Sequence, residues 1–319
     1  MSILASELAR MAGPKCQGIV AATMQRWEDK IRERVRLEMA LKLADESGWE
    51  RQVQRVGVVL SDGLPTALVP YEDDLTKKLA EIAGMFRPDL QSFSEGASAL
   101  QQLLDRLGDL DRSWADRAAV AAVNVSPLLK LVEELLSLAA QATFTETLRK
   151  INQDILGAYF PVGKKAKSNG PPVIEVYWAV LGGVAKTIDV DVEGLTLVVL
   201  THELAHAYSH LGADTDGNRW SDKAFCDSDV FIKEGIAQYY TDRIMHWLEQ
   251  RNVGRPFHAF TELLKIQGSP YQIHQEWSKE FSPEGVRAAI IECRNSQITA
   301  ADAFIGLMEM AKQRLTRRS

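Results

Sequence analysis

The chain has 319 residues, a length that fits two domains or one domain with a large insertion. With 46% hydrophobic and 25% charged residues, its composition excludes a disordered chain, a collagen-like repeat and a membrane bundle. The formal net charge is −6, so no overall positive field would attract nucleic acid or an anionic membrane, and we expect neither as a partner.

Cysteine usage and the N-terminal residues are typical of a reducing compartment. Cys16, Cys226 and Cys293 are too few and too widely spaced for a disulfide framework, and no CxxC pair is present. Charged residues interrupt the first 30 positions, so no signal-peptide core is recognised, and no run approaches the ~20 apolar residues of a membrane span. We therefore expect a cytoplasmic protein.

The first 160 residues show a mostly helical pattern. Apolar residues recur at helical spacing over 24–44, and an alternating segment at 51–60 with a turn at 61–63 predicts a small hairpin with 67–71. Further helices are expected over 73–84, 94–108, 113–123, 126–142 and 143–156. Because none of these segments carries a chemical motif, the role of residues 1–160 stays open, with a protein partner as one alternative.

A loop rich in glycine, proline and lysine at 163–172 predicts a domain boundary near residue 160. The segment 173–180 is rich in β-branched and aromatic residues and predicts a strand. Either the edge of this strand receives an extended peptide, or the strand only covers a neighbouring helix. A turn at Gly182 and Gly183, a short extended piece through Val190, and three or four helices over 256–319 follow. The expected fold class is therefore α+β and mainly helical.

The segment that carries chemistry is DVEGLTLVVLTHELAHAYSHLG, residues 191–212, which contains an HExxH motif. On a helix, His202 and His206 lie on one face, one turn apart, so both imidazoles can reach a single zinc ion. Glu203 then stands beside the metal. The alternative to a metal site is a helix with two hydrogen-bonded histidines and an ion-paired glutamate.

The residues at the two ends of this segment favour a helix over a buried strand. Asp191 is a good N-cap, and Gly212 is a natural residue at a helix end. Leu195 and Val199 fall on the same stripe as the two histidines. The pattern predicts a mostly buried helix with its histidines facing a cleft.

A catalytic zinc site needs a third protein ligand and an open position. His210 continues the row of histidines, but on a straight helix it would lie ~12 Å from His202, too far to share one metal. The metzincin pattern is rejected because it requires histidine where this chain has Gly212. Asp214 and Asp216 follow closely and stay open as ligands, although their segment also reads as a polar turn.

Glu234 is the favoured third ligand, 28 residues after His206 in the segment KEGIAQYY. HELAH followed by this segment resembles the gluzincin metallopeptidases, in which a glutamate on the next helix completes HExxH. The spacing is also similar to that of the bacterial IrrE-like regulatory proteases. The resemblance covers about 173–250 and implies a zincin-like domain over 161–319. It implies zinc bound by His202, His206 and Glu234, with Glu203 as the general base.

This arrangement has a clear chemistry. Zinc held by two imidazoles and a carboxylate lowers the pKa of a water ligand to about 7 and polarises a peptide carbonyl, and Glu203 passes the water's proton to the leaving amine. Tyr240 is the favoured donor to the developing oxyanion, with Tyr239, Tyr271 and His274 as alternatives. We predict a zinc metallopeptidase, a hydrolase acting on a peptide or protein substrate. The alternative is a zinc-bearing interaction or regulatory module without proteolytic activity.

Overall fold

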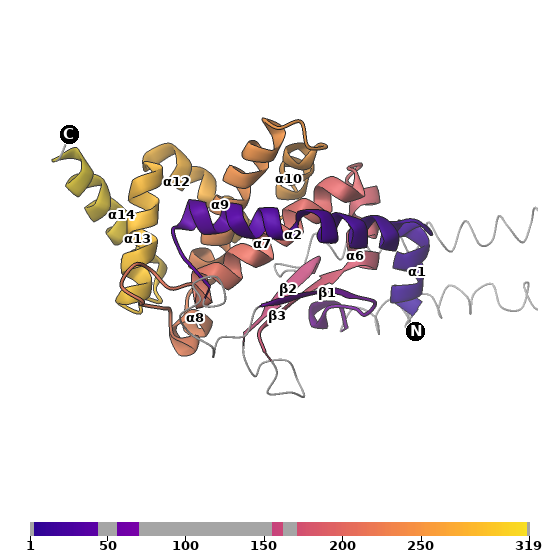
Figure 1. The fold of residues 1–319 in the computed structure, drawn as a ribbon, viewed down its shortest axis with the longest axis horizontal. Coiled ribbons are helices and arrows are strands. Elements are labelled where there is room, and N and C mark those ends of the chain that lie inside the picture. Colours follow the sequence, from indigo (N-terminus) through magenta and orange to yellow (C-terminus); the bar gives the residue numbers. More distant parts are fainter. Residues whose placement is uncertain (1–2, 44–55, 70–154, 162–170, 318–319) are drawn as a thin grey trace, which may run out of the picture. The chain divides into compact units, whose positions relative to one another are not determined.

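The computed structural model describes residues 3–43, 56–69, 155–161 and 171–317 (Figure 1). The chain divides into two compact units, Met1–Glu7 with Leu68–Ile151 and Leu8–Ala67 with Asn152–Ser319. The contacts and the site described below lie in the second unit. The helices expected between 73 and 154 and most of the loop expected at 163–172 lie outside the described residues, so they stay predictions.

The described residues are mainly helical, with a small sheet, and this confirms the expected α+β class. No helix among them is long and apolar enough to cross a membrane. The helices are α1 Ile3–Ala12, α2 Cys16–Met39, α6 Trp178–Thr187, α7 Val192–Leu211, α8 Asp222–Asp227, α9 Val230–Glu249, α10 Pro256–Leu264, α11 Ser269–Gln272, α12 His274–Glu280, α13 Pro283–Asn295 and α14 Ala301–Thr316. The strands are β1 Gly57–Ser61, β2 Gly157–Phe160 and β3 Val173–Tyr177, and Thr66–Leu68 forms a 3₁₀ turn.

Helix α7 is the centre of the unit and is packed by α2, α9 and α10. It is buried from Gly194 to His210, as its long apolar run predicts. The expected N-cap is confirmed, because the Asp191 carboxylate accepts a hydrogen bond from the Gly194 N–H. Gly212 ends the helix for a different reason than expected. Its φ is −63°, and a Cβ there would lie 2.9 Å from Leu41 Cβ, so the glycine permits a close approach of two chain segments.

Helix α2 comes from the first 160 residues and packs along α7, within the unit that holds the predicted metallopeptidase segment. It starts earlier and ends earlier than the pattern over 24–44 predicts, and Ala40 terminates it with a φ of 54°. The chain then returns along the end of α7, where Lys42 and Ala213 exchange two backbone hydrogen bonds of 2.9 and 2.7 Å. The two helices are thereby joined at their carboxyl ends.

The strands lie in the order β1-β3-β2, with β1 parallel and β2 antiparallel to β3. Two expectations are corrected here. The described part of the expected hairpin is not paired as one, because β1 pairs with the distant β3 and Thr66–Leu68 form a 3₁₀ turn. The strand at 173–177 is the middle strand and not an edge, so within the described sheet β2 and β1 provide the edges.

Helix α6 replaces the turn expected at Gly182 and Gly183. The strand ends at Tyr177, and the Trp178 indole N–H donates to Asp62 at 2.7 Å, which ties the start of α6 to the turn after β1. Gly182 lies inside the helix, where a Cβ would collide with Ala12 and Cys16. The glycine therefore marks close packing of helices and not a turn.

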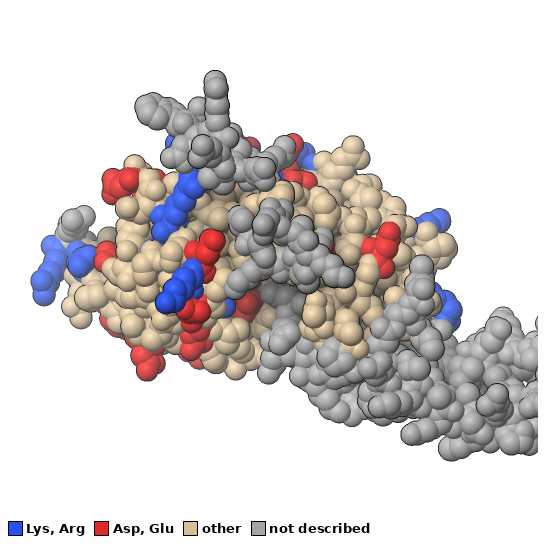
Figure 2. All heavy atoms as spheres, turned by 90° about the horizontal axis from the view of Figure 1, so that it is seen from below, with Lys and Arg blue, Asp and Glu red and all other residues tan. Residues whose placement is uncertain are grey.

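The described surface carries both signs of charge. Figure 2 shows Lys and Arg side chains lying among Asp and Glu side chains on the described part of one face. This mixed pattern agrees with the small negative net charge of the sequence.

Candidate metal centre

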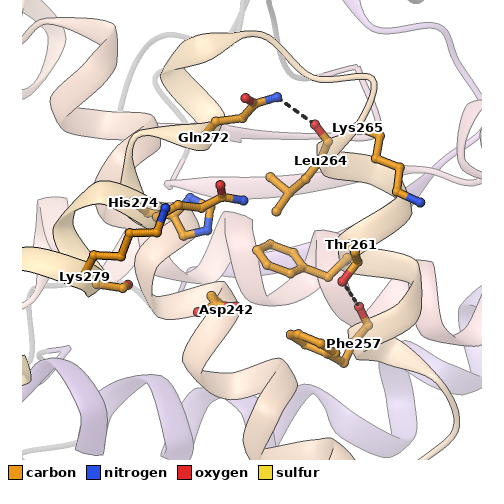
Figure 3. Close-up of a pocket in the computed structure, with 11 residues that line it drawn as sticks. Asp242, Phe257, Thr261, Leu264, Lys265, Gln272, His274 and Lys279 are labelled. Atoms are coloured by element: carbon orange, nitrogen blue, oxygen red, sulfur yellow. Dashed lines mark hydrogen bonds between the residues drawn. The ribbon is translucent and has the colours of Figure 1, made fainter.

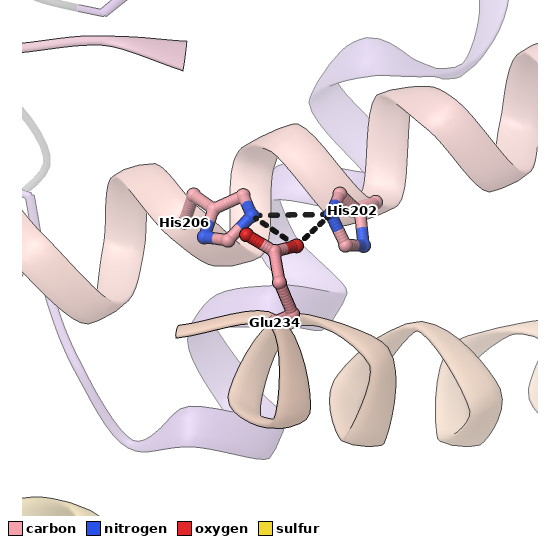
Figure 4. A group of neighbouring side chains, drawn as sticks. All are labelled: His202, His206 and Glu234. Atoms are coloured by element: carbon pink, nitrogen blue, oxygen red, sulfur yellow. Dashed lines mark hydrogen bonds and ion pairs between the residues drawn. The ribbon is translucent and has the colours of Figure 1, made fainter. Parts of the chain in front are cut away.

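Three side chains from α7 and α9 converge on one point (Figure 4). His202 Nε2 and His206 Nε2 lie 3.1 Å apart, one turn from each other on α7. Glu234 Oε2 from α9 lies 3.2 Å from His202 Nε2 and 3.3 Å from His206 Nε2. All three residues are buried. The ligand set expected from the sequence is thus brought together by two neighbouring helices.

The spacing of these atoms fits a zinc ion. Ligands about 2.0–2.1 Å from a tetrahedral zinc are about 3.3 Å from one another, close to the three distances of 3.1, 3.2 and 3.3 Å between the donor atoms. Two imidazole nitrogens and a carboxylate oxygen that face a common point present lone pairs to it, which is the chemistry that a divalent cation requires. Within the described ranges these three residues form the one such group of histidine, cysteine and acidic side chains.

Glu234 owes its position to the way α9 begins and packs. Asp229 caps the helix by accepting a hydrogen bond of 2.9 Å from the Phe231 N–H. At Gly235 a Cβ would collide with the Trp277 ring, so the glycine allows α12 to pack against α9 next to Glu234. Glu234 and Gly235 therefore have different roles: Glu234 is the candidate ligand, and Gly235 allows the packing that fixes α9.

Glu203 lies beside the ligands on α7 and is buried under the sheet. A Cβ at Gly157 of β2 would be 2.9 Å from both Cγ and Oε1 of Glu203, so the strand backbone lies directly against this carboxyl group. On β3, the Tyr177 phenol donates to Glu175 at 2.9 Å. Burial, the Glu175 carboxylate and the charge of Glu203 raise the pKa of Tyr177. Gly157 was not among the residues expected to form the site.

Tyr240 and Tyr271, two of the candidate oxyanion donors, differ in their position relative to the candidate ligands. Tyr240 is six residues after Glu234, about 120° around the helix, and its ring packs edge to face on Tyr239 with centroids 5.3 Å apart. Burial raises its pKa, and its electrostatic neighbours are Tyr239, Arg287, Arg243 and Glu38. Tyr271, by contrast, has its ring 6.1 Å from the ring of His202.

His274 lies next to Tyr271 and interacts electrostatically with the candidate ligand His202. Its Nδ1 lies 2.8 Å from the Tyr271 carbonyl oxygen, and the ring is buried. Burial lowers the pKa of His274, against the opposing effect of the Asp242 carboxylate, and the charge of His202 lowers it further. The lowered pKa favours the neutral imidazole, whose electrostatic neighbours are His202 of the metal centre and Asp242 of α9.

The other expected or excluded ligands lie apart from the cluster. Asp214 accepts hydrogen bonds from the backbone N–H groups of Asp216 and Asn218 at 2.9 and 2.8 Å. It therefore stabilises a polar turn, which was the alternative to a role as metal ligand. His210, which was excluded as a ligand, lies 2.9 Å from the Tyr159 phenol oxygen through Nδ1. Neither belongs to the metal-binding group.

A pocket of about 520 Å³ lies between α9, α10 and α12 (Figure 3). Phe257, Phe260 and Leu264 form its apolar wall, and Asp242 and His274 line it as well. The His274 ring is 5.8 Å from that of Phe260. His274 thus lines the pocket and also interacts electrostatically with the candidate ligand His202.

Comparison with family models, with curated proteins and with solved structures found no match to this chain.

Proposed function

We propose that the chain is a zinc-dependent metallopeptidase with a zincin-like domain of the gluzincin type. The observation that carries the proposal is the convergence of His202, His206 and Glu234 within 3.3 Å of one another, with Glu203 next to His202 on the same buried helix. An arrangement made only to bind metal requires the three ligands but not the adjacent carboxylate. The presence of Glu203 therefore favours hydrolysis over a binding role.

The chain's own groups have separate roles in this proposal. His202, His206 and Glu234 hold the zinc, which when bound polarises a peptide carbonyl and acidifies water. Glu203 accepts a proton from the attacking water and delivers it to the leaving amine, so the carbon–nitrogen bond breaks while a carbon–oxygen bond forms. The products are a carboxylate and an amine, and no oxidant or other reactant is required.

For the developing oxyanion we assign the donor role to Tyr271 in preference to Tyr240. Tyr271 packs beside a ligand, whereas Tyr240 lies on a different face of α9 among arginines. A phenol is a suitable hydrogen-bond donor to an oxyanion if it lies on the open side of the metal. The neighbouring pocket, with its walls of phenylalanine and leucine, offers a place for an apolar side chain of the substrate.

The proposal is tested with the purified full-length chain. We expect about one zinc per chain by elemental analysis and cleavage products from a peptide library by mass spectrometry. Removal of the metal by a chelator should stop cleavage, and added zinc should restore it. A chain that binds zinc stoichiometrically and yields no product from any peptide would instead be the zinc-bearing interaction module.

A further inference from the structure

A row of polar side chains joins β2, α7 and α8 beyond the metal centre. The Tyr159 phenol oxygen lies 2.9 Å from His210 Nδ1, and His210 Nε2 lies 2.9 Å from Asp222 Oδ1. The imidazole is completely buried and stacks on Phe225, with ring centroids 4.3 Å apart and planes 10° from parallel. His210 thus has a well-defined environment that the metal-binding group does not use.

The hydrogen bond between Tyr159 and His210 constrains where the imidazole proton lies. Burial, the Asp222 carboxylate and Cys226 raise the pKa of Tyr159, so the phenol keeps its proton at neutral pH. The phenol can therefore donate to Nδ1 of His210, and in a neutral imidazole that accepts this bond the ring proton is on Nε2, 2.9 Å from Asp222 Oδ1. Because the Asp222 side chain is 66% exposed, water competes for that end of the row, and the bond to Tyr159 is the better protected link.

Strand β2 connects this row to Glu203. Gly157 and Tyr159 are two residues apart on β2, so both face the same side of the strand. Gly157 lies against the Glu203 carboxyl group, and Tyr159 is bonded to His210 further along the same helix. Since β2 is at an edge of the described sheet, strand pairing holds it on one side only. The link to His210 is therefore a second attachment of the strand to α7.

We propose that His210 is a positioning residue which, through Tyr159, holds β2 against Glu203. The inference rests on the proposed function, because it concerns the geometry of the proposed general base. If the link is lost, β2 can move away from α7 and the Glu203 carboxyl group loses the backbone that packs against it. A misplacement of about 1 Å in a catalytic group can cost about 10²-fold in rate.

Two substitutions of His210 separate positioning from packing in the full-length, zinc-loaded chain. In His210→Asn the amide oxygen takes the place of Nδ1 and can still accept from Tyr159. In His210→Gln the amide nitrogen takes the place of Nε2, so only the Asp222 end is kept. Both variants lose the stacking on Phe225, so a role in packing alone would affect them equally.

We expect His210→Gln and Tyr159→Phe to lower kcat about tenfold or more, with KM within about twofold and full zinc content. Backbone amides of residues 157–160 should exchange with solvent about tenfold faster in these two variants. His210→Asn should stay close to the native chain in both readouts. The control is His258→Gln, whose side chain is 49% exposed on α10.

The hydrogen-exchange comparison makes the result independent of the proposed activity. If the native chain cleaves no peptide, the proposed function fails, while faster exchange of β2 in His210→Gln but not in His210→Asn still supports the attachment. Should His210→Gln not fold, Tyr159→Phe, which removes one oxygen atom, takes its place. Unchanged exchange of β2 in Tyr159→Phe, or equal effects of the asparagine and glutamine variants, would overturn the inference.

Discussion

His202 and Glu234 are 32 positions apart in the chain, yet His202 Nε2 lies 3.2 Å from Glu234 Oε2 in a buried place between α7 and α9. Burying a carboxylate costs free energy unless a positive charge or hydrogen bonds compensate it. A zinc ion between the two helices would supply that charge and would connect the helices through its ligands. Metal binding and folding stability should therefore be linked.

The first prediction concerns that linkage. A ligand that binds only the folded chain stabilises it by about 2.7 kcal/mol when its free concentration is 100-fold above Kd. We expect zinc to raise the melting temperature of the native chain, and His206→Ala and Glu234→Ala to remove both the bound zinc and this increase. Asp214→Ala is the control, and it should keep the metal. If Glu234→Ala retained zinc while Asp214→Ala lost it, the ligand set would be wrong.

The second prediction uses two tyrosines. Tyr271→Phe removes a phenol beside His202 and should lower kcat about 10²-fold, the effect of losing one oxyanion donor. Tyr240→Phe removes a buried phenol on a different face of α9 and should leave kcat within about twofold. Steady-state kinetics on one peptide substrate compare the two. The reverse order of effects would return the donor role to Tyr240.

The third prediction concerns Gly157. An added Cβ would lie 2.8 Å from Val199 Cγ1 and 2.9 Å from Glu203 Oε1, so Gly157→Ala must displace β2 or the carboxyl group. We expect a loss of about 1–3 kcal/mol in the free energy of unfolding. A fall in kcat of about tenfold or more should accompany it.

Gly306 in α14 provides the matched control for this variant, because a Cβ there meets nothing within 4 Å. Gly306→Ala should leave kcat unchanged and stabilise the chain by about 0.5–1 kcal/mol, since alanine favours a helix. Chemical denaturation measures both variants. Equal behaviour of the two alanine variants would show that the contact between β2 and Glu203 has no consequence.

The fourth prediction is a pH dependence. Burial lowers the pKa of His274 below its ordinary value of 6.5, so below that pH the unfolded chain binds a proton that the folded chain resists. The free energy of unfolding should therefore fall as pH decreases below about 6.5. His274→Gln should lose less stability than the native chain between about pH 7 and 5, whereas His258→Gln should follow the native curve. Parallel curves for all three proteins would contradict this account.

The two helices of the site could be predicted from the sequence because their signals are local. Asp191 marks the start of α7, the HExxH spacing defines one helix face, and the segment around Glu234 has the pattern of a second helix. That these faces meet could be expected only through the resemblance to gluzincins. The structure adds the contact of Gly235 with Trp277, which fixes α9 and has no local signal.

The sheet could not be predicted in the same way, because its pairing is not local. Strand β1 pairs with β3 more than a hundred positions later, so the turn after β1 wrongly indicated a hairpin. Strand β2 is only four residues long and follows a region with a helical pattern. Its one available signal was Gly157 followed by Ala-Tyr-Phe, a glycine before residues that favour strands. The role of Tyr159 and Gly157 became visible only when β2 was placed on α7.

The most direct test of the account is a comparison of the native chain with Glu203→Gln. Glutamine keeps the size and polarity of the side chain but cannot accept a proton from water at neutral pH. Elemental analysis should find equal zinc in both proteins, and the rate of peptide hydrolysis should fall by at least about 10²–10⁴-fold in the variant. Equal zinc with equal hydrolysis in the two proteins would contradict the role of Glu203 as general base.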